Sequence, residues 1–185
     1  MSTLIRHGKV ADDHWQWIEG DLPRVVERLE AGEHLVLPLA VWSAHRARLD
    51  PLHSGVWLGP DDAPETLLPW LAGIPLVAIH FPVFTDGRGY SLAHLLRRRH
   101  GYSGELQAVG DVLVDQLALM AQCGFDSFRL RADQSPAAAL AALAGGLRSP
   151  WPGPVVPRFA AASAGHDVTP AYSLDMMHCR IDGRD

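Results

Sequence analysis

The stretch PLVAIHFPVFTDGRGYSLAHLLRRRHGYSGELQAVG, residues 75–110, decides the fold class. It opens on an apolar run at 75–81 and closes on another strand-sized run at 105–110. Between them, the segment 90–101 carries leucines at the i, i+3, i+4 spacing of an amphipathic helix and ends on a glycine. A strand, a helix and a second strand in succession predict a βαβ unit with parallel strands.

The same alternation extends on both sides of this unit. Further strand-like runs lie at 34–42, 55–59 and 125–130, and further helix-like segments lie at 23–31, 63–73, 111–124 and 135–147. Ser91 and Asp111 are placed to cap the helices that follow them. We therefore expect an α/β fold of about five mainly parallel strands alternating with helices. Two architectures stay open, an incomplete (β/α)-barrel-like sheet and an open doubly wound sheet, and both have their active edge at the carboxyl ends of the strands.

The two ends of the chain differ from this regular middle. Residues 1–22 are irregular and contain polar clusters together with Trp15 and Trp17, and they predict a small hairpin or cover. After position 148 the sequence is rich in Pro, Ala and Gly, a composition typical of an extended tail. We therefore expect a single α/β domain at 1–148 and a tail at 149–185.

The composition is that of a soluble globular protein and argues against several classes of function. Of the 185 residues, 48% are hydrophobic and 20% are charged, and the net charge of −5 disfavours a general nucleic-acid-binding surface. No stretch reaches the roughly 18 apolar residues of a membrane span, and the N-terminus lacks a signal-peptide pattern. These features predict a cytoplasmic protein that binds neither nucleic acid nor membranes.

The sequence contains no recognisable cofactor motif. Its two cysteines, Cys123 and Cys179, are too few for a four-thiolate zinc or iron–sulfur site, and its ten histidines lack metal-binding spacing. The glycine-rich loop at 87–89 fits neither the dinucleotide fingerprint nor the P-loop, because no third glycine and no Gly-Lys-Ser/Thr follows. The sequence therefore indicates no metal site and no cofactor, and it identifies no nucleophile or base.

Charged side chains follow each predicted strand and would share one edge of the sheet. They are His45 and Arg46 after the first strand, Asp61 and Asp62 after the second, Asp86 and Arg88 after the third, Asp111 after the fourth, and Arg129, Arg131 and Asp133 after the fifth. Such a mixture is typical of a small-molecule site. His80, which lies near the end of an apolar run, is interpreted as a core histidine.

The loop Asp86-Gly87-Arg88-Gly89-Tyr90-Ser91 is the strongest candidate site. Its glycines allow a close approach to the backbone, and the N-terminus of the following helix offers free N–H groups beside Arg88. This combination suits phosphate, sulfate or carboxylate. The same residues also suit a tight Asp-Gly turn and a capping serine without any ligand.

Residues 81–130 resemble a bacterial family of unknown function. The segments that carry the resemblance are Phe-x-x-Phe-Thr-Asp-Gly-Arg-Gly-Tyr-Ser at 81–91, Gly-Glu-Leu-x-Ala-Val-Gly-Asp-Val-Leu at 104–113, Asp-Gln-Leu at 115–117 and Cys-Gly-Phe-Asp at 123–126. Members of that family are described as probable oxidoreductases involved in sulfite reduction, and their genes lie beside the gene of the sulfite reductase haemoprotein. Gln107 stands where the family usually places an arginine.

The resemblance implies an accessory protein of assimilatory sulfate/sulfite reduction, and two roles stay open. In the first, the protein binds a small anion, and the candidate binding residues are Asp86, Gly87, Arg88, Gly89, Tyr90, Ser91, Asp111, Asp115, Gln116 and Arg129. In the second, it is a non-enzymatic partner or assembly factor that docks on sulfite reductase or its electron donor. Exposed aromatic side chains would then make the contacts, with Trp15, Trp17, Trp57, Trp70 and Trp151 as candidates. Whether the protein is an enzyme stays open, because no flavin, nicotinamide or haem motif supports the oxidoreductase description.

Overall fold

A computed structural model describes residues 3–18 and 22–145. The predicted tail at 149–185, with Trp151 and Cys179, lies outside the described residues. The strands are β1 (Leu4–Arg6), β2 (Lys9–Ala11), β3 (Trp15–Trp17), β4 (His34–Pro38), β5 (Ser54–Leu58), β6 (Leu76–Phe81), β7 (Glu105–Gly110) and β8 (Ser127–Arg129). The α-helices are α1 (Leu22–Glu30), α2 (Leu39–His45), α3 (Arg88–His94), α4 (Leu117–Cys123) and α5 (Pro136–Gly145). Short 3₁₀ or π segments are η1 (Arg46–Arg48), η2 (Pro64–Gly73), η3 (Leu95–Arg99) and η4 (Val114–Gln116).

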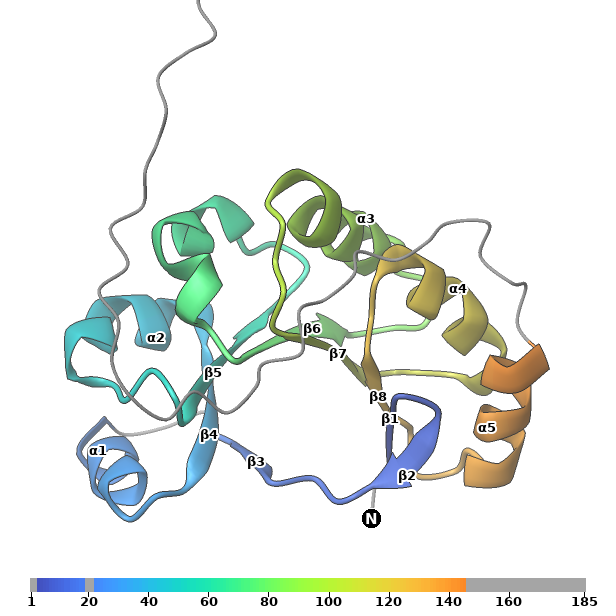
Figure 1. Cartoon of the computed structure of the whole chain (residues 1–185), viewed down its shortest axis with the longest axis horizontal. Coiled ribbons are helices and arrows are strands. Elements are labelled where there is room, and N and C mark those ends of the chain that lie inside the picture. Colours follow the sequence, from blue (N-terminus) through green and yellow to red (C-terminus); the bar gives the residue numbers. More distant parts are fainter. Residues whose placement is uncertain (1–2, 19–21, 146–185) are drawn as a thin grey trace, which may run out of the picture. The chain divides into compact units, whose positions relative to one another are not determined.

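The eight strands form one sheet in the order β2-β1-β8-β7-β6-β5-β4-β3. Strands β3 to β8 are parallel, and each of β3 to β7 pairs with the strand that follows it in the sequence. Strand β1 pairs antiparallel with both β2 and β8. This sequential order confirms the barrel-like alternative, since a doubly wound sheet reverses its strand order at a switch point. The helices therefore lie along the outer side of a curled, open sheet, a half-barrel (Figure 1).

The curl brings the two ends of the half-barrel close together. Strands β2 and β3 are the opposite edges of the sheet, yet the segment 12–14 joins them directly. Arg129, at the end of β8, donates from Nη2 to Oδ2 of Asp13 in this segment at 2.5 Å. The guanidinium carbon of Arg129 also lies 5.3 Å from the ring centre of Trp17 on β3. A side chain of β8 thus reaches across the concave side to the far edge.

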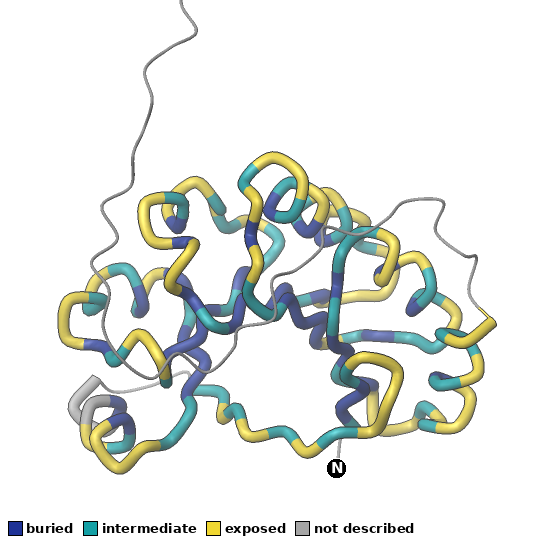
Figure 2. The backbone as a smooth tube through the Cα atoms, in the orientation of Figure 1, coloured by how far each residue is buried: buried dark blue, intermediate teal, exposed yellow. Residues whose placement is uncertain are grey.

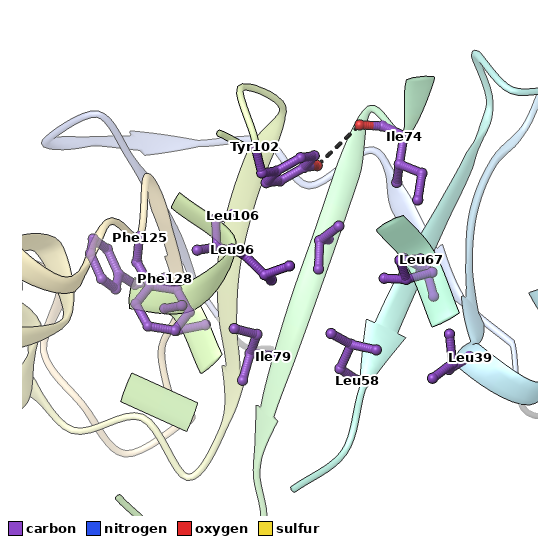
Figure 3. Close-up of a cluster of buried hydrophobic side chains, with 14 of the residues drawn as sticks. Leu39, Leu58, Leu67, Ile74, Ile79, Leu96, Tyr102, Leu106, Phe125 and Phe128 are labelled. Carbon is purple, nitrogen blue, oxygen red and sulfur yellow. Dashed lines mark hydrogen bonds between the residues drawn. The ribbon is translucent and has the colours of Figure 1, made fainter. Parts of the chain in front are cut away.

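The alternation of side chains along the strands gives the sheet two different faces. On β6, Val77, Ile79 and Phe81 point outward and pack under the helices, while Leu76 and Ala78 belong to a separate inner cluster. Figure 3 shows part of the outer core, where the Tyr102 hydroxyl also donates to the carbonyl oxygen of Ile74 at 3.1 Å. The buried positions follow the strands and the inward sides of the helices (Figure 2). The inner cluster consists of Val36, Leu76, Ala78 and Val109, packed against Trp15, Trp17 and Trp57.

Several element boundaries differ from the sequence-based expectation. The apolar run 34–42 divides after Pro38, because Leu39 and Trp42, three residues apart, bury one face of helix α2. Helix α3 begins at Arg88, so Ser91 lies inside the helix and the prediction that it is the N-cap is wrong. Asp111 is not an N-cap either, since the helical segment after β7 starts with η4 at Val114. The hairpin expected near the N-terminus is present as β1 and β2, whereas strand β3 was not predicted.

Candidate functional site

A cavity of about 230 Å³ opens on the concave side of the half-barrel. It is lined by Trp17, Trp57, His80, Val109, Gly110 and Arg129. Each of these residues is the last or the second-last of its strand, so the cavity lies at the carboxyl ends of β3, β5, β6, β7 and β8. This is the edge at which parallel α/β sheets bind ligands.

Three aromatic rings from three strands form one wall of the cavity. The ring centres of Trp17 and Trp57 are 6.2 Å apart, and those of Trp57 and His80 are 5.8 Å apart with the rings edge to face. Gly110 borders the imidazole and has a φ of +94°, a conformation that favours glycine. A Cβ atom at position 110 would lie 3.0 Å from Nε2 of His80 and 2.3 Å from the carbonyl oxygen of Phe81. Glycine is therefore required where the imidazole edge meets the cavity.

The side chains that line the cavity leave three buried N–H groups without partners. Nε1 of Trp17, Nε1 of Trp57 and Nε of Arg129 are buried and make no hydrogen bond to any described residue. Leaving a buried donor unpaired costs about 1–3 kcal/mol. Indole and guanidinium nitrogens donate and cannot accept. The residues that line the cavity therefore carry three unpaired donors, one of them on a cation, and such donors suit a ligand that carries negative charge.

Gln107 adds further unpaired polar atoms to the interior of the half-barrel. It lies on β7 two residues before Val109 and so faces the same concave side. Its side chain is fully buried, and neither the amide nitrogen nor the amide oxygen has a hydrogen-bond partner among the described residues. At the amino ends of β7 and β8 the side chains are paired instead, since Glu105 accepts hydrogen bonds from Arg6 at 2.9 Å and from Ser127 at 2.5 Å.

The predicted anion loop lies outside this cavity, and each of the three side-chain nitrogens of its arginine donates to a carboxylate. Arg88 donates from Nη1 to Asp61 at 2.5 Å, and from Nε and Nη2 to the two oxygens of Asp86 at 3.0 and 2.8 Å. The hydrogen bonds from the Arg88 side chain and backbone lower the pKa of Asp86. Arg88 thus joins the loop after β5 to the loop after β6, and the local charge of one arginine and two aspartates is negative.

A second ion-pair cluster joins the loops after β7 and β8. Asp111 accepts from the backbone N–H of Phe84 at 3.0 Å and from Nη1 of Arg131 at 2.7 Å. Arg131 also holds Asp133 and lowers the pKa of that carboxyl group to about 2. Gln116 donates to the Phe84 carbonyl oxygen at 2.8 Å. Asp111 therefore orders a loop, and we call these two clusters together, with Arg88 and Arg131 at their centres, the rim.

Residues 55–146 match the family model of DUF934, described as a bacterial protein of unknown function. The matched DUF934 segment runs from β5 to the end of α5, so it contains both rim clusters and all cavity residues except Trp17. A comparison with curated proteins finds no match. Within the described residues, no helix is long and apolar enough to cross a membrane, and no group of three or more His, Cys, Asp or Glu side chains could hold a metal ion.

The remaining candidate residues of the DUF934 segment either pack against Phe81 or are exposed, and none of them lines the cavity. A Cβ atom at Gly89 would lie 2.5 Å from Cζ of Phe81, so this glycine allows α3 to pack against β6. Tyr90 packs edge to face on the same phenylalanine ring at 5.4 Å, and its burial raises its pKa. Gly87, Ser91 and Asp115 are exposed. The predicted loop is therefore largely explained by packing and by ion pairs.

Of the residues that the sequence singled out for anion binding, Arg129 lines the cavity. Sequence reasoning missed Trp17, Trp57 and His80 as residues of the candidate site. For Trp57 and His80 the available signal was their position in the later part of a predicted strand. Trp17 lies on β3, which was not predicted, so this signal was not available for it. The interpretation of Trp15, Trp17 and Trp57 as exposed docking aromatics is wrong, because they are half-buried on the concave side, whereas Trp70 is exposed at 37%.

Proposed function

We propose that this protein binds a small anion in the cavity at the carboxyl ends of β3, β5, β6, β7 and β8. One observation carries the proposal: Trp17, Trp57 and Arg129, which line a single cavity, each carry a buried N–H donor without a partner among the described residues. An anionic group beside Arg129 would accept from these donors and remove the cost of leaving them unpaired. The imidazole of His80 completes the polar lining.

The arrangement of charges favours the cavity over the Asp-Gly-Arg-Gly-Tyr-Ser loop as the anion site. Arg88 already donates to Asp61 and Asp86, so an anion at the loop would have to displace one carboxylate and approach the other. Arg129 has one carboxylate partner, Asp13, and keeps its Nε–H for a ligand.

We further propose that the anion-binding protein is an accessory component of assimilatory sulfate/sulfite reduction. The support for this pathway is the resemblance of residues 81–130 to the family described as probable oxidoreductases of sulfite reduction. Deletion of the gene, followed by growth on sulfate, sulfite, sulfide or cysteine, tests the assignment. We expect growth on sulfate or sulfite to fail while growth on sulfide or cysteine continues, and normal growth on sulfate would refute the pathway.

Titration calorimetry with small anions tests the binding site. Arg129→Met should lower the affinity roughly 10- to 100-fold, the range expected for loss of a hydrogen bond to a charged group. Arg88→Met is the matched control, because it makes the same substitution at the rim and should leave the affinity unchanged. Equal binding by wild-type protein and Arg129→Met, with a loss in Arg88→Met, would move the site to the loop.

A docking role on sulfite reductase or its electron donor is the second candidate, and one observation favours it. Val83 and Phe84 are consecutive, apolar and exposed at 50% and 45%, on the loop beside the rim. Exposed aromatic side chains are common anchors of protein interfaces. Val83→Ser together with Phe84→Ser should then abolish co-elution with the haemoprotein without changing anion affinity. If wild-type protein fails to co-elute at micromolar concentrations, this candidate is eliminated.

A further inference from the structure

The cavity is larger and more apolar than an inorganic anion requires. A water molecule occupies about 30 Å³ in the liquid, so 230 Å³ corresponds to roughly seven or eight waters. A sulfur or phosphorus atom with its oxygens would fill a fraction of this space and would meet the donors of Trp17, Trp57 and Arg129 at its edge. The rest of the lining would stay in contact with water.

That remaining lining is mostly carbon. The rings of Trp17 and Trp57 and the side chain of Val109 supply it, and the glycine at 110 adds no side chain. The ring contacts join Trp17, Trp57 and His80 into a continuous wall. Apolar surface of this kind is stabilised when an apolar group covers it. At 230 Å³ the cavity is also below the roughly 300–1,000 Å³ of pockets that enclose drug-sized ligands, so the group must be small.

We propose that the ligand is a small organic acid, a carboxylate or sulfonate whose apolar body lies against the aromatic wall. The inference deepens the proposed anion-binding function and rests on it. The charged end accepts hydrogen bonds from Arg129 Nε and from the indole nitrogens, and the apolar end covers Trp57 and Val109. Asp13 pairs with Nη2 of Arg129 and holds this side chain, while the Nε–H has no partner among the described residues.

The charge of the site supports a monoanion over a multiply charged ligand. Arg129 carries one positive charge, and the carboxylate of Asp13, 2.5 Å from Nη2, formally balances it. The indole groups donate hydrogen bonds but carry no charge. A single carboxylate or sulfonate group adds one net negative charge to this pair, whereas a dianion would bring two into a partly buried site.

Calorimetric titration of the full-length protein with sulfate, methanesulfonate, benzenesulfonate and benzoate tests the proposal. We expect benzenesulfonate and benzoate to bind about tenfold more tightly than sulfate, the gain from covering roughly 60 Å² of apolar surface. Methanesulfonate should fall between them. This ranking uses wild-type protein, so it does not depend on the folding of any variant.

The outcomes separate this proposal from the one on which it rests. If sulfate binds as tightly as benzenesulfonate and Arg129→Met abolishes both, the anion site stands and the organic-acid inference is overturned. If none of the four anions binds at millimolar concentration, both fail. Trp57→Leu should reduce the affinity for benzenesulfonate to that for methanesulfonate, while Trp70→Leu, an exposed tryptophan on η2, should change neither.

Discussion

Two neighbouring regions of this protein carry arginines at the carboxyl ends of the same sheet, and they differ in whether those arginines are satisfied. At the rim, Arg88 and Arg131 each bind two aspartates. In the cavity, Arg129 has one carboxylate partner, and its Nε–H, like the indole N–H groups beside it, is buried without a partner among the described residues. The rim has the motif that attracts attention in the sequence, yet the unpaired N–H group on an arginine belongs to the cavity. Polar groups left unpaired in a cavity are the stronger indication of a ligand.

The largest expected effect on stability concerns the two glycines of the Asp-Gly-Arg-Gly-Tyr-Ser loop. Gly89→Ala should lower the free energy of unfolding by about 1–3 kcal/mol, because its Cβ atom would lie 2.5 Å from the buried ring of Phe81. Gly87→Ala is the matched control, since a Cβ atom added there would have no neighbouring atom within 4 Å and the φ of Gly87 is −75°. It should change the unfolding free energy by less than about 0.5 kcal/mol. Chemical denaturation measures both, and equal effects would show that Gly89 is not required for packing.

The next effect concerns the indole donors of the cavity. Trp17→Phe and Trp57→Phe keep an aromatic ring and remove the N–H group, so each should weaken binding of benzenesulfonate about 2- to 10-fold. Trp70→Phe should leave the affinity unchanged, because this residue is exposed outside the cavity. Unchanged affinity in both cavity variants, measured by calorimetry, would show that the indole nitrogens do not contact the ligand.

Much of the fold could be predicted from the sequence. The five strands from β4 to β8 are apolar runs that alternate with helical spacing, so their presence and parallel pairing follow from local pattern. Strands β1 to β3 have three residues each, too few for alternation to show, and unlike the equally short β8 they do not follow a helix-like segment that would mark a βα unit. The half-barrel itself depends on strand order and on the contact between Arg129 and Asp13, which join distant parts of the chain.

The cavity was harder to predict for the same reason. Its lining comes from the ends of five strands, and each residue taken singly resembles an ordinary core or surface residue. Arg88 is conspicuous in the sequence because it lies between two glycines. Its pairing with Asp61, in contrast, depends on the tertiary structure. Whether a donor is satisfied is a property of the fold, and local sequence does not determine it.

The third effect is a pH dependence of stability that we expect from an ion pair of the rim. Arg131 lowers the pKa of Asp133 to about 2, below the ordinary value of 3.8. A depressed folded-state pKa means that this ion pair stabilises the protein above pH 4 and that its contribution is lost as the pH falls from about 4 to 2. Asp133→Asn should therefore lower the melting temperature slightly at pH 7 and leave it unchanged near pH 2. A constant difference between the two proteins across this range would contradict the role of the pair.

The smallest effect is expected at Arg88. Its ion pairs are exposed, and exposed pairs contribute little to stability because water screens them. Arg88→Met should therefore leave the melting temperature and the anion affinity within experimental error of wild type. A clear fall in affinity would mean that the rim takes part in binding.

The most direct test of the account is a ¹H–¹⁵N NMR titration that follows the side-chain N–H signals of the six tryptophans and of the arginine Nε groups. The account predicts that benzenesulfonate shifts the indole signals of Trp17 and Trp57 and the Nε–H signal of Arg129 in a saturable manner, while the signals of Trp70 and Arg88 stay in place. A saturable shift of Arg88 with no change at Trp17, Trp57 and Arg129 would contradict it and assign the anion to the rim.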